Sequence, residues 1–146
     1  MARLILDTGL LIANARGKLD LSLIAAGDDL ALPAVVIAEY REGVLRTVDE
    51  RRRSAHQAFL DEMLELMPVV EYTAEVAEHH AELLAHARGA GVPRGAHDLI
   101  IAASARATNR VLLTRDARAR FDELPGVDTR VVAIPGSGPG SRVRST

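Results

Sequence analysis

A strongly apolar helix followed directly by an apolar strand is predicted for residues 97–116. Residues 97–110 are rich in Ala and contain no Gly or Pro, which favours a helix, and the segment 99–103 is apolar on almost every side, as in a buried helix. The Val-Leu-Leu run at 111–113 is typical of a strand that is covered on both faces in a parallel sheet. The segment therefore places Asp98 at a helix start and Asp116 just beyond the carboxyl end of a strand, where open α/β sheets bind their ligands.

The rest of the chain continues this alternation of strands and helices. Further strands are expected at 3–6, 30–32, 68–71 and 130–134, and further helices at 19–26, 34–48, 51–67, 74–88 and 117–124. Such an alternation predicts a three-layer α/β/α sandwich with a central, largely parallel sheet. Residues 1–134 are expected to form one domain, and residues 135–146, which are rich in Gly, Pro, Ser and Arg, a disordered tail.

Apolar stripes at helical spacing indicate which faces of three helices are buried. The expected inward-facing residues are Val36, Tyr40, Val44 and Val48 in helix 34–48; Ala55, Phe59, Met63 and Leu66 in helix 51–67; and Ala77, Ala81 and Leu84 in helix 74–88.

Composition excludes several classes of protein. The chain of 146 residues has no cysteine, so it contains neither disulfides nor a thiolate metal site. It lacks a Gly-x-x-x-x-Gly-Lys phosphate-binding loop, an apolar run long enough to span a membrane and a signal peptide, so a cytoplasmic protein is expected. The net charge of −2 gives no argument for a nucleic-acid partner.

Four acidic residues occupy related positions in the predicted fold. Asp7 and Asp116 each end an apolar strand, Asp98 begins the buried helix, and Glu39 lies in the helix after the second strand. If the first and fourth strands are neighbours, both strand-end acids meet at one sheet edge, and the helix before the fourth strand starts at that same edge. Three of the four also have a purely structural explanation: Asp98 as a partner of the helix dipole, Asp116 as a helix N-cap, and Glu39 as a solvated side chain.

Carboxylates gathered in one pocket repel one another and hold protons unless a cation is present. Mg²⁺ prefers oxygen ligands and keeps several of its waters. Such an ion polarises a phosphoryl oxygen and activates a water for in-line displacement. The four acids therefore predict metal-assisted hydrolysis of a phosphodiester.

The sequence resembles the PIN-domain ribonucleases, and most of all their VapC-type toxins, over residues 3–134. The segments that carry the resemblance are Leu4-Ile5-Leu6-Asp7-Thr8, Pro33-Ala-Val-Val-Ile-Ala-Glu39 with Gly43, Asp98-Leu-Ile-Ile-Ala-Ala-Ser-Ala105, and Leu113-Thr114-Arg115-Asp116 followed by Phe121. The chain departs from the family pattern at Gly9, where a Ser or Asn is common, and at Ala34-Val35, where a Ser or Thr is common.

The resemblance implies endonucleolytic cleavage of RNA that depends on Mg²⁺ or Mn²⁺, homodimers, and a small antitoxin that occupies the active-site groove. It also implies that the metal is held by Asp7, Glu39, Asp98 and Asp116, with Thr114 as a nearby polar support.

Arg115 and Arg118 are candidates for contacts with RNA phosphates or with an antitoxin carboxylate; a charged, exposed helix face is the alternative explanation.

Two other functions stay open at the level of sequence. One is a non-catalytic PIN-like module that binds RNA or protein, although such a module has no need for four mutually repelling carboxylates. The other is a phosphoacceptor or phosphohydrolase domain, but a receiver domain needs a lysine from a late strand, and the only lysine of this chain is Lys18.

Overall fold

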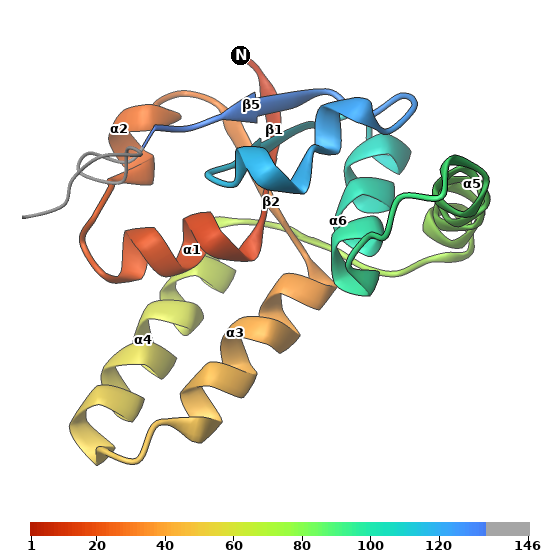
Figure 1. Ribbon diagram of the computed structural model, residues 1–146. Coiled ribbons are helices and arrows are strands. Elements are labelled where there is room, and N and C mark those ends of the chain that lie inside the picture. Colours follow the sequence, from red (N-terminus) through yellow and green to blue (C-terminus); the bar gives the residue numbers. More distant parts are fainter. Residues whose placement is uncertain (134–146) are drawn as a thin grey trace, which may run out of the picture.

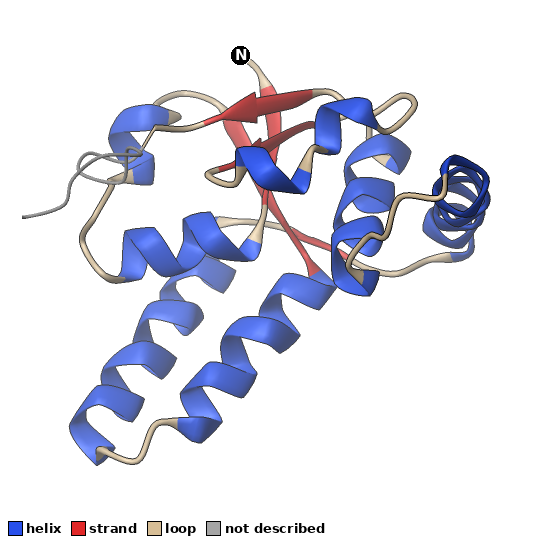
Figure 2. Cartoon of the chain, in the orientation of Figure 1, coloured by secondary structure: helices blue, strands red, loops and turns tan. Residues whose placement is uncertain are grey.

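The computed structural model describes residues 1–133, apart from the side chains of Leu23 and Ile24. Its described part contains five strands, β1 (Arg3–Leu6), β2 (Asp29–Pro33), β3 (Val69–Val70), β4 (Val111–Thr114) and β5 (Thr129–Val131), in the spatial order β3-β2-β1-β4-β5. Every pair of neighbours in this sheet runs parallel. The predicted α/β/α sandwich with a parallel sheet is thus confirmed (Figure 2).

Helices cover both faces of this sheet (Figure 1). They are α1 (Thr8–Ala15), α2 (Leu21–Ile24), α3 (Ala34–Arg46), α4 (Glu50–Leu66), α5 (Ala74–Ala90) and α6 (Ala96–Ala107). Figure 1 shows α1 and α2 on one side of the strands and α6 on the other, with α5 packed outside α6. Because the crossovers between parallel strands are right-handed, a reversal of strand order moves the connecting helices to the opposite face.

The strand order reverses at β1, and this reversal fixes where a ligand can bind. From β1 the chain moves outward to β2 and β3, then returns to place β4 on the other side of β1, with Leu4 opposite Val111 and Leu6 opposite Leu113. The carboxyl ends of β1 and β4 therefore form the switch point at which open α/β sheets bind ligands.

The core lies between the sheet and the helices. The strand residues Leu4, Ile5, Leu112 and Leu113 are fully buried, and in α6 the run 101–105 is buried as expected for an apolar helix. The expected strand at 130–134 is Thr129–Val131, and the expected helix at 19–26 contains only the short α2. Residue 134 and the predicted tail, 135–146, lie outside the described residues.

Residues 117–124 do not form the predicted α-helix. They form two 3₁₀ turns, Ala117–Ala119 and Phe121–Glu123, separated by Arg120 with a φ of 48°. A left-handed residue cannot continue an α-helix, so the chain turns twice here before β5.

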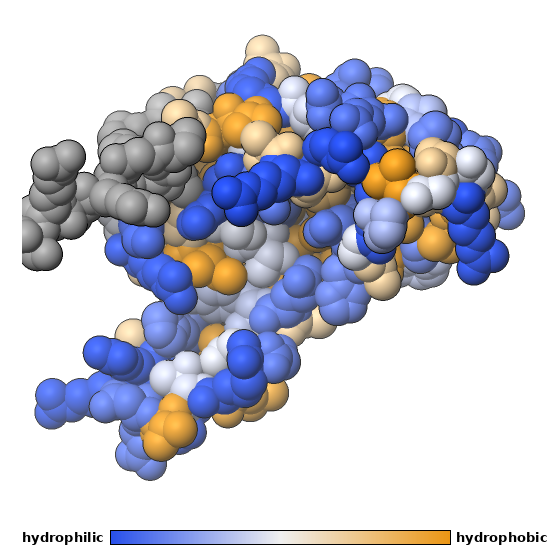
Figure 3. All heavy atoms as spheres, in the orientation of Figure 1, coloured by the Kyte–Doolittle hydropathy of each residue, from blue (hydrophilic) through white to orange (hydrophobic). Residues whose placement is uncertain are grey.

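Four of the predicted inward-facing residues are wrong. Val48 and Ala55 are exposed because the helix pair α3 and α4 extends beyond the sheet (Figure 1), whereas Leu66 and Ala81 lie off the buried faces of α4 and α5. Val48 is 91% exposed and Leu66 is 67% exposed, and Ala55 and Ala81 are exposed as well. In their place, Leu60 and Leu83 are buried. Figure 3 shows that mostly hydrophilic side chains cover this pair of helices, with hydrophobic groups near the outer end.

None of the helices within residues 1–133 is both long enough and apolar enough to cross a membrane.

Candidate active site

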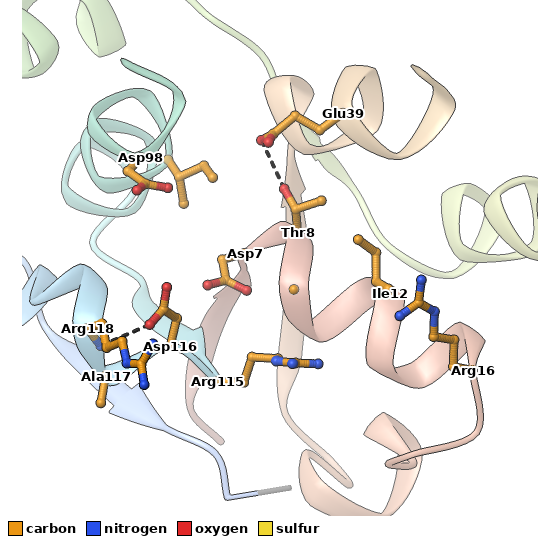
Figure 4. A pocket seen from close by; sticks show the side chains of 12 residues that line it. Asp7, Thr8, Ile12, Arg16, Glu39, Asp98, Arg115, Asp116, Ala117 and Arg118 are labelled. Atoms are coloured by element: carbon orange, nitrogen blue, oxygen red, sulfur yellow. Dashed lines mark hydrogen bonds between the residues drawn. The ribbon is translucent and has the colours of Figure 1, made fainter. Parts of the chain in front are cut away.

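The four predicted acids line one open cleft at the switch point between β1 and β4. This cleft has a volume of about 860 Å³. Figure 4 shows Asp7, Asp98, Asp116 and Glu39 around it, each supplied by a different element. The sequence-based expectation that these four side chains face one cleft is therefore correct.

Asp7 lies at the base of the cleft, where β1 passes into α1. Its backbone N–H donates to the carbonyl of Leu113 over 3.1 Å, which extends the pairing of β1 with β4 by one residue. Its side chain is the N-cap of α1 and accepts the N–H of Leu10 over 3.1 Å. The carboxylate is held firmly, because a cap position and a sheet register both fix its backbone.

Thr114 joins two of the acids. Its hydroxyl donates to Asp7 Oδ2 and accepts the backbone N–H of Asp116 over 3.0 Å. The Thr114 side chain is 1% exposed, so the bridge is shielded from water. The Thr114 bridge holds the carboxyl end of β4, and with it Asp116, next to Asp7.

Asp116 starts the first 3₁₀ turn and accepts the N–H of Arg118 over 2.9 Å. The capping explanation for this acid is therefore correct, and it is compatible with a place in the cleft, because the same carboxylate also lines the cavity.

Glu39 lies on α3, which borders the cleft, and it contacts two polar side chains. It accepts the hydroxyl of Thr8 over 2.9 Å (Figure 4), and its Oε2 lies 3.6 Å from Nδ1 of His97. Glu39 is therefore not simply a solvated acid: Thr8 ties it to the start of α1, next to Asp7.

Asp98 projects into the cleft from the first turn of α6, which begins after Gly95. A Cβ atom at Gly95 would lie 3.0 Å from Asp98 Oδ2. A side chain at position 95 would therefore push against this carboxylate and shift it.

Gly9, where the sequence departs from the family pattern, lies beside the side chain of Arg115. A Cβ atom at position 9 would lie 3.2 Å from Cγ of Arg115 and 3.4 Å from Asp7 Oδ1. The missing side chain provides the room in which Arg115 crosses the floor of the cleft toward α1 (Figure 4). Arg118 is also at the rim, so both predicted arginines line the cavity.

Arg16 and Arg94 were not singled out from the sequence. Arg16, at the end of α1, lines the cleft on the side opposite Arg118. Arg94 donates to the carbonyls of Ala119 and Arg120 over 2.6 and 2.8 Å, which fixes the turn after Asp116. No pattern in the sequence marks either residue, because their places depend on how segments distant in the chain pack together.

The Asp7 carboxyl is in an environment that disfavours its charge. Burial raises its pKa, and the charges of Asp98 and Asp116 raise it further, while hydrogen bonds from Thr114 and Leu10 act in the opposite direction. Acids with perturbed pKa values in a cleft are typical of functional sites.

The pKa of Asp98 is raised for similar reasons. Burial is the largest cause, followed by the charges of Glu39 and Asp116, and the effect is partly offset by His97 and Arg94. Within residues 1–133, no three His, Asp or Glu side chains are close enough together to form a ready-made metal site. The acids therefore surround the cleft at a wider spacing and repel one another across it.

The raised pKa of Asp7 predicts that Asp7→Asn stabilises the protein in EDTA at pH 7. The folded state binds the proton of this carboxyl more tightly than the unfolded state, so the ionised group destabilises the fold at neutral pH, and this cost disappears as pH falls through the raised pKa. Asn caps a helix as well as Asp does. We expect a gain of about 1 kcal/mol at pH 7 that shrinks on acidification.

Thermal or urea unfolding of the parent and the Asp7→Asn variant at pH 7 and pH 5 measures this effect. A variant that is less stable than the parent at pH 7, or a difference that grows as the pH is lowered, would contradict it.

A family model and a known protein both match most of this chain. The PIN domain family model matches residues 4–127. Ribonuclease VapC of Rickettsia bellii (strain RML369-C) is 28% identical over 131 residues, which cover 90% of this chain and 97% of that protein.

The fold of this chain is also similar to that of solved structures. The structure of VapBC-5 from Mycobacterium tuberculosis, a member of the VapBC family of toxin–antitoxin systems, has 30% identity and a TM-score of 0.75, with 90% of this chain and 100% of that chain covered. The structure of VapBC2 from Rickettsia felis, bound to a DNA fragment from its promoter, matches with a TM-score of 0.79 and 24% identity. The match covers 89% of this chain and 98% of that chain, and it supports the assignment of the fold.

Proposed function

Since this chain belongs to the PIN-domain family, we propose that it is a divalent-metal-dependent endoribonuclease and the toxin of a toxin–antitoxin pair. The observation that carries the proposal is the ring of four carboxylates around one cleft at the β1–β4 switch point. The similarity to Ribonuclease VapC and to VapBC complexes supports the choice of RNA as substrate and of an antitoxin as partner.

The residues of the cleft fit a hard divalent ion. They offer carboxylate oxygens, which Mg²⁺ and Mn²⁺ prefer, and two of the acids, Asp7 and Asp98, have pKa values raised by burial and by their acidic neighbours. The wide spacing of the acids suits Mg²⁺, which binds through one or two carboxylates and keeps several waters. Asp7, Glu39, Asp98 and Asp116 would hold the ion and its waters.

When bound, the ion would polarise a phosphoryl oxygen and lower the pKa of a nearby water. Asp7 and Asp116, fixed through Thr114, orient that water in line with the scissile bond. The water loses a proton and its oxygen bonds to phosphorus as the bond from phosphorus to the 3′ oxygen breaks; the departing 3′ oxygen takes up a proton, which yields 5′-phosphate and 3′-hydroxyl ends. Arg115 and Arg118, at the rim, contact phosphates of the bound RNA or a carboxylate of the antitoxin.

We also propose homodimers. Large hydrophobic side chains are exposed on α3, on α4 and in the connection between them; they include Leu45, Leu66 and Val48, of which Leu45 is 64% exposed. Contact with a second copy would remove such surface from water.

Incubation of total RNA with the purified protein in Mg²⁺, in Mn²⁺ and in EDTA tests the proposed activity. We expect cleavage with either ion, none in EDTA, and products that carry 5′-phosphates. Stable binding of RNA without cleavage, by folded protein and with each ion, would instead favour a PIN-like binding module.

Loss of the Thr114 hydroxyl should reduce cleavage without unfolding the protein. Thr114→Val keeps the shape of the side chain but removes the bridge between Asp7 and the backbone of Asp116. Loss of groups that orient metal ligands typically costs about 10–100-fold in activity, and we expect a fall in kcat/KM of this size. Thr114→Ser retains the hydroxyl and serves as the control; equal activities of the Val and Ser variants would show that the bridge has no role.

A further inference from the structure

A second cavity lies next to the acidic cleft, between α1, α3 and α4. It has a volume of about 260 Å³. Ile12, Arg16 and Glu39 line both hollows, so the two adjoin each other along the end of α1. A chain that lies across the acidic cleft can therefore extend one of its groups into this second cavity.

The hydroxyl of Tyr40 is the distinctive feature of the second cavity. Tyr40 is 6% exposed and lines the cavity, with its ring 5.8 Å from that of Phe59. Its hydroxyl is shielded from solvent and makes no hydrogen bond to any of the residues described by the structure. A buried hydroxyl normally has a partner, and leaving one unsatisfied is costly. Tyr40 thus brings to the wall of the cavity a polar group that lacks a partner among the described residues.

The charges around this cavity differ from those of the acidic cleft. Its lining includes two arginines, Arg16 and Arg46, against the single acid Glu39, with His56 beside them. Arg46 pairs with Glu42 through Nε over 2.7 Å, but a guanidinium has five donors and can bind a phosphate as well. The sign of the charge therefore changes from acidic to basic along the path from Asp7 to α4, as suits a phosphodiester chain whose next phosphate lies beyond the reacting one.

We propose that this cavity binds the base of an RNA nucleotide that flanks the cleaved bond, with the Tyr40 hydroxyl on the edge of the base and Arg16 on the adjoining phosphate. The proposal rests on the proposed function and adds a specificity pocket to it. The volume is below the range of about 300–1,000 Å³ for drug-sized ligands, which suits a single base better than a segment of a protein partner. Hydrogen bonding to the edges of unstacked bases is the usual way in which proteins read single-stranded RNA.

Tyr40→Phe tests the pocket, because it removes only the hydroxyl. Tyr72→Phe is the matched control: Tyr72 is 53% exposed and its hydroxyl lies 2.8 Å from His80, outside both cavities. The assay compares kcat/KM for RNA oligonucleotides that differ in the base at each position flanking the cut. For Tyr40→Phe we expect the base preference at one flanking position to fall about fivefold, which is the effect of one hydrogen bond. The change should appear mainly in KM. The Tyr72→Phe control should keep the base preference of the parent.

Arg16→Gln tests the phosphate contact by direct binding. RNA affinity is measured in EDTA by fluorescence anisotropy at several salt concentrations, with Arg88→Gln on α5 as the control. Loss of one phosphate contact should lower the slope of log K against log salt by about 0.7 for a single strand. An unchanged slope would overturn this part of the proposal.

The outcomes separate this proposal from the proposed function. If the parent protein cleaves RNA and Tyr40→Phe keeps both its base preference and its KM, the pocket is wrong and the ribonuclease stands. If Tyr40→Phe weakens binding of the antitoxin and leaves RNA recognition unchanged, the cavity serves a protein partner and the proposal is again wrong. If the parent cleaves no RNA, the proposed function fails, and the anisotropy measurement on both variants still decides whether RNA occupies the cavity.

Discussion

Replacing Asp7 with Asn is expected to lower the rate of RNA cleavage by at least about a hundredfold. Groups that merely orient metal ligands account for about 10–100-fold, and Asp7 is the most buried of the four acids and is proposed to contact the ion itself. The same change is expected to stabilise the protein in EDTA, since it removes a charge that burial and acidic neighbours disfavour. Loss of activity together with a gain in stability is the result expected when a charged side chain serves function at the expense of stability.

Asp122→Asn is the control for this experiment, because Asp122 is an exposed acid of the second 3₁₀ turn. Cleavage rates of the parent and both variants are compared on one RNA at saturating Mg²⁺, with circular dichroism as the check on folding. A folded Asp7→Asn variant that cleaves as fast as the parent would exclude Asp7 from the reaction.

Replacing Arg110 with Met is expected to destabilise the fold by about 2–3 kcal/mol. The guanidinium, 8% exposed, lies at the amino ends of the strands, where it donates to the carbonyls of Leu4 and Asp29 over 3.1 and 3.0 Å and pairs with the Asp29 carboxylate. It thereby ties β4 to β1 and β2. Its loss removes one donor from each of these two carbonyls and leaves the Asp29 carboxylate without this counter-charge.

Urea unfolding of Arg110→Met beside Arg51→Met, a change at an exposed position of α4, measures the difference. The control should stay within about 0.5 kcal/mol of the parent. Because Arg110 lies at the end of the strands opposite the acids, folded Arg110→Met should still cleave RNA. A stability equal to that of the parent would contradict the assigned role of this buried arginine.

The sequence was sufficient to predict that the four acids would face one cleft, because this prediction depends on local patterns. Short apolar runs that end in Asp7 and Asp116 predict where two strands stop, and the geometry of a parallel sheet then brings their ends together. Asp98 is placed by the length of the helix that precedes β4. None of these inferences requires a side-chain contact to be known in advance.

The features that the sequence did not predict are set by tertiary contacts. Thr8 meets Glu39 only because α1 packs on α3, and Arg94 meets the turn after β4 only once that turn exists. The stripe that placed Val48 inside is correct as far as Val44, but helix periodicity does not reveal that α3 ends at Arg46 beyond the edge of the sheet.

Titration of Mn²⁺ followed by electron paramagnetic resonance, on the parent and on Asp98→Asn, tests the central claim most directly. An uncleavable DNA analogue of the substrate is included, because Mg²⁺ and similar ions often draw ligands from substrate phosphates. The account predicts that the parent with the analogue immobilises Mn²⁺ and that Asp98→Asn loses most of this binding. Equal Mn²⁺ binding by the two proteins, or none by either, would contradict the claim that the four acids form a metal-dependent catalytic site.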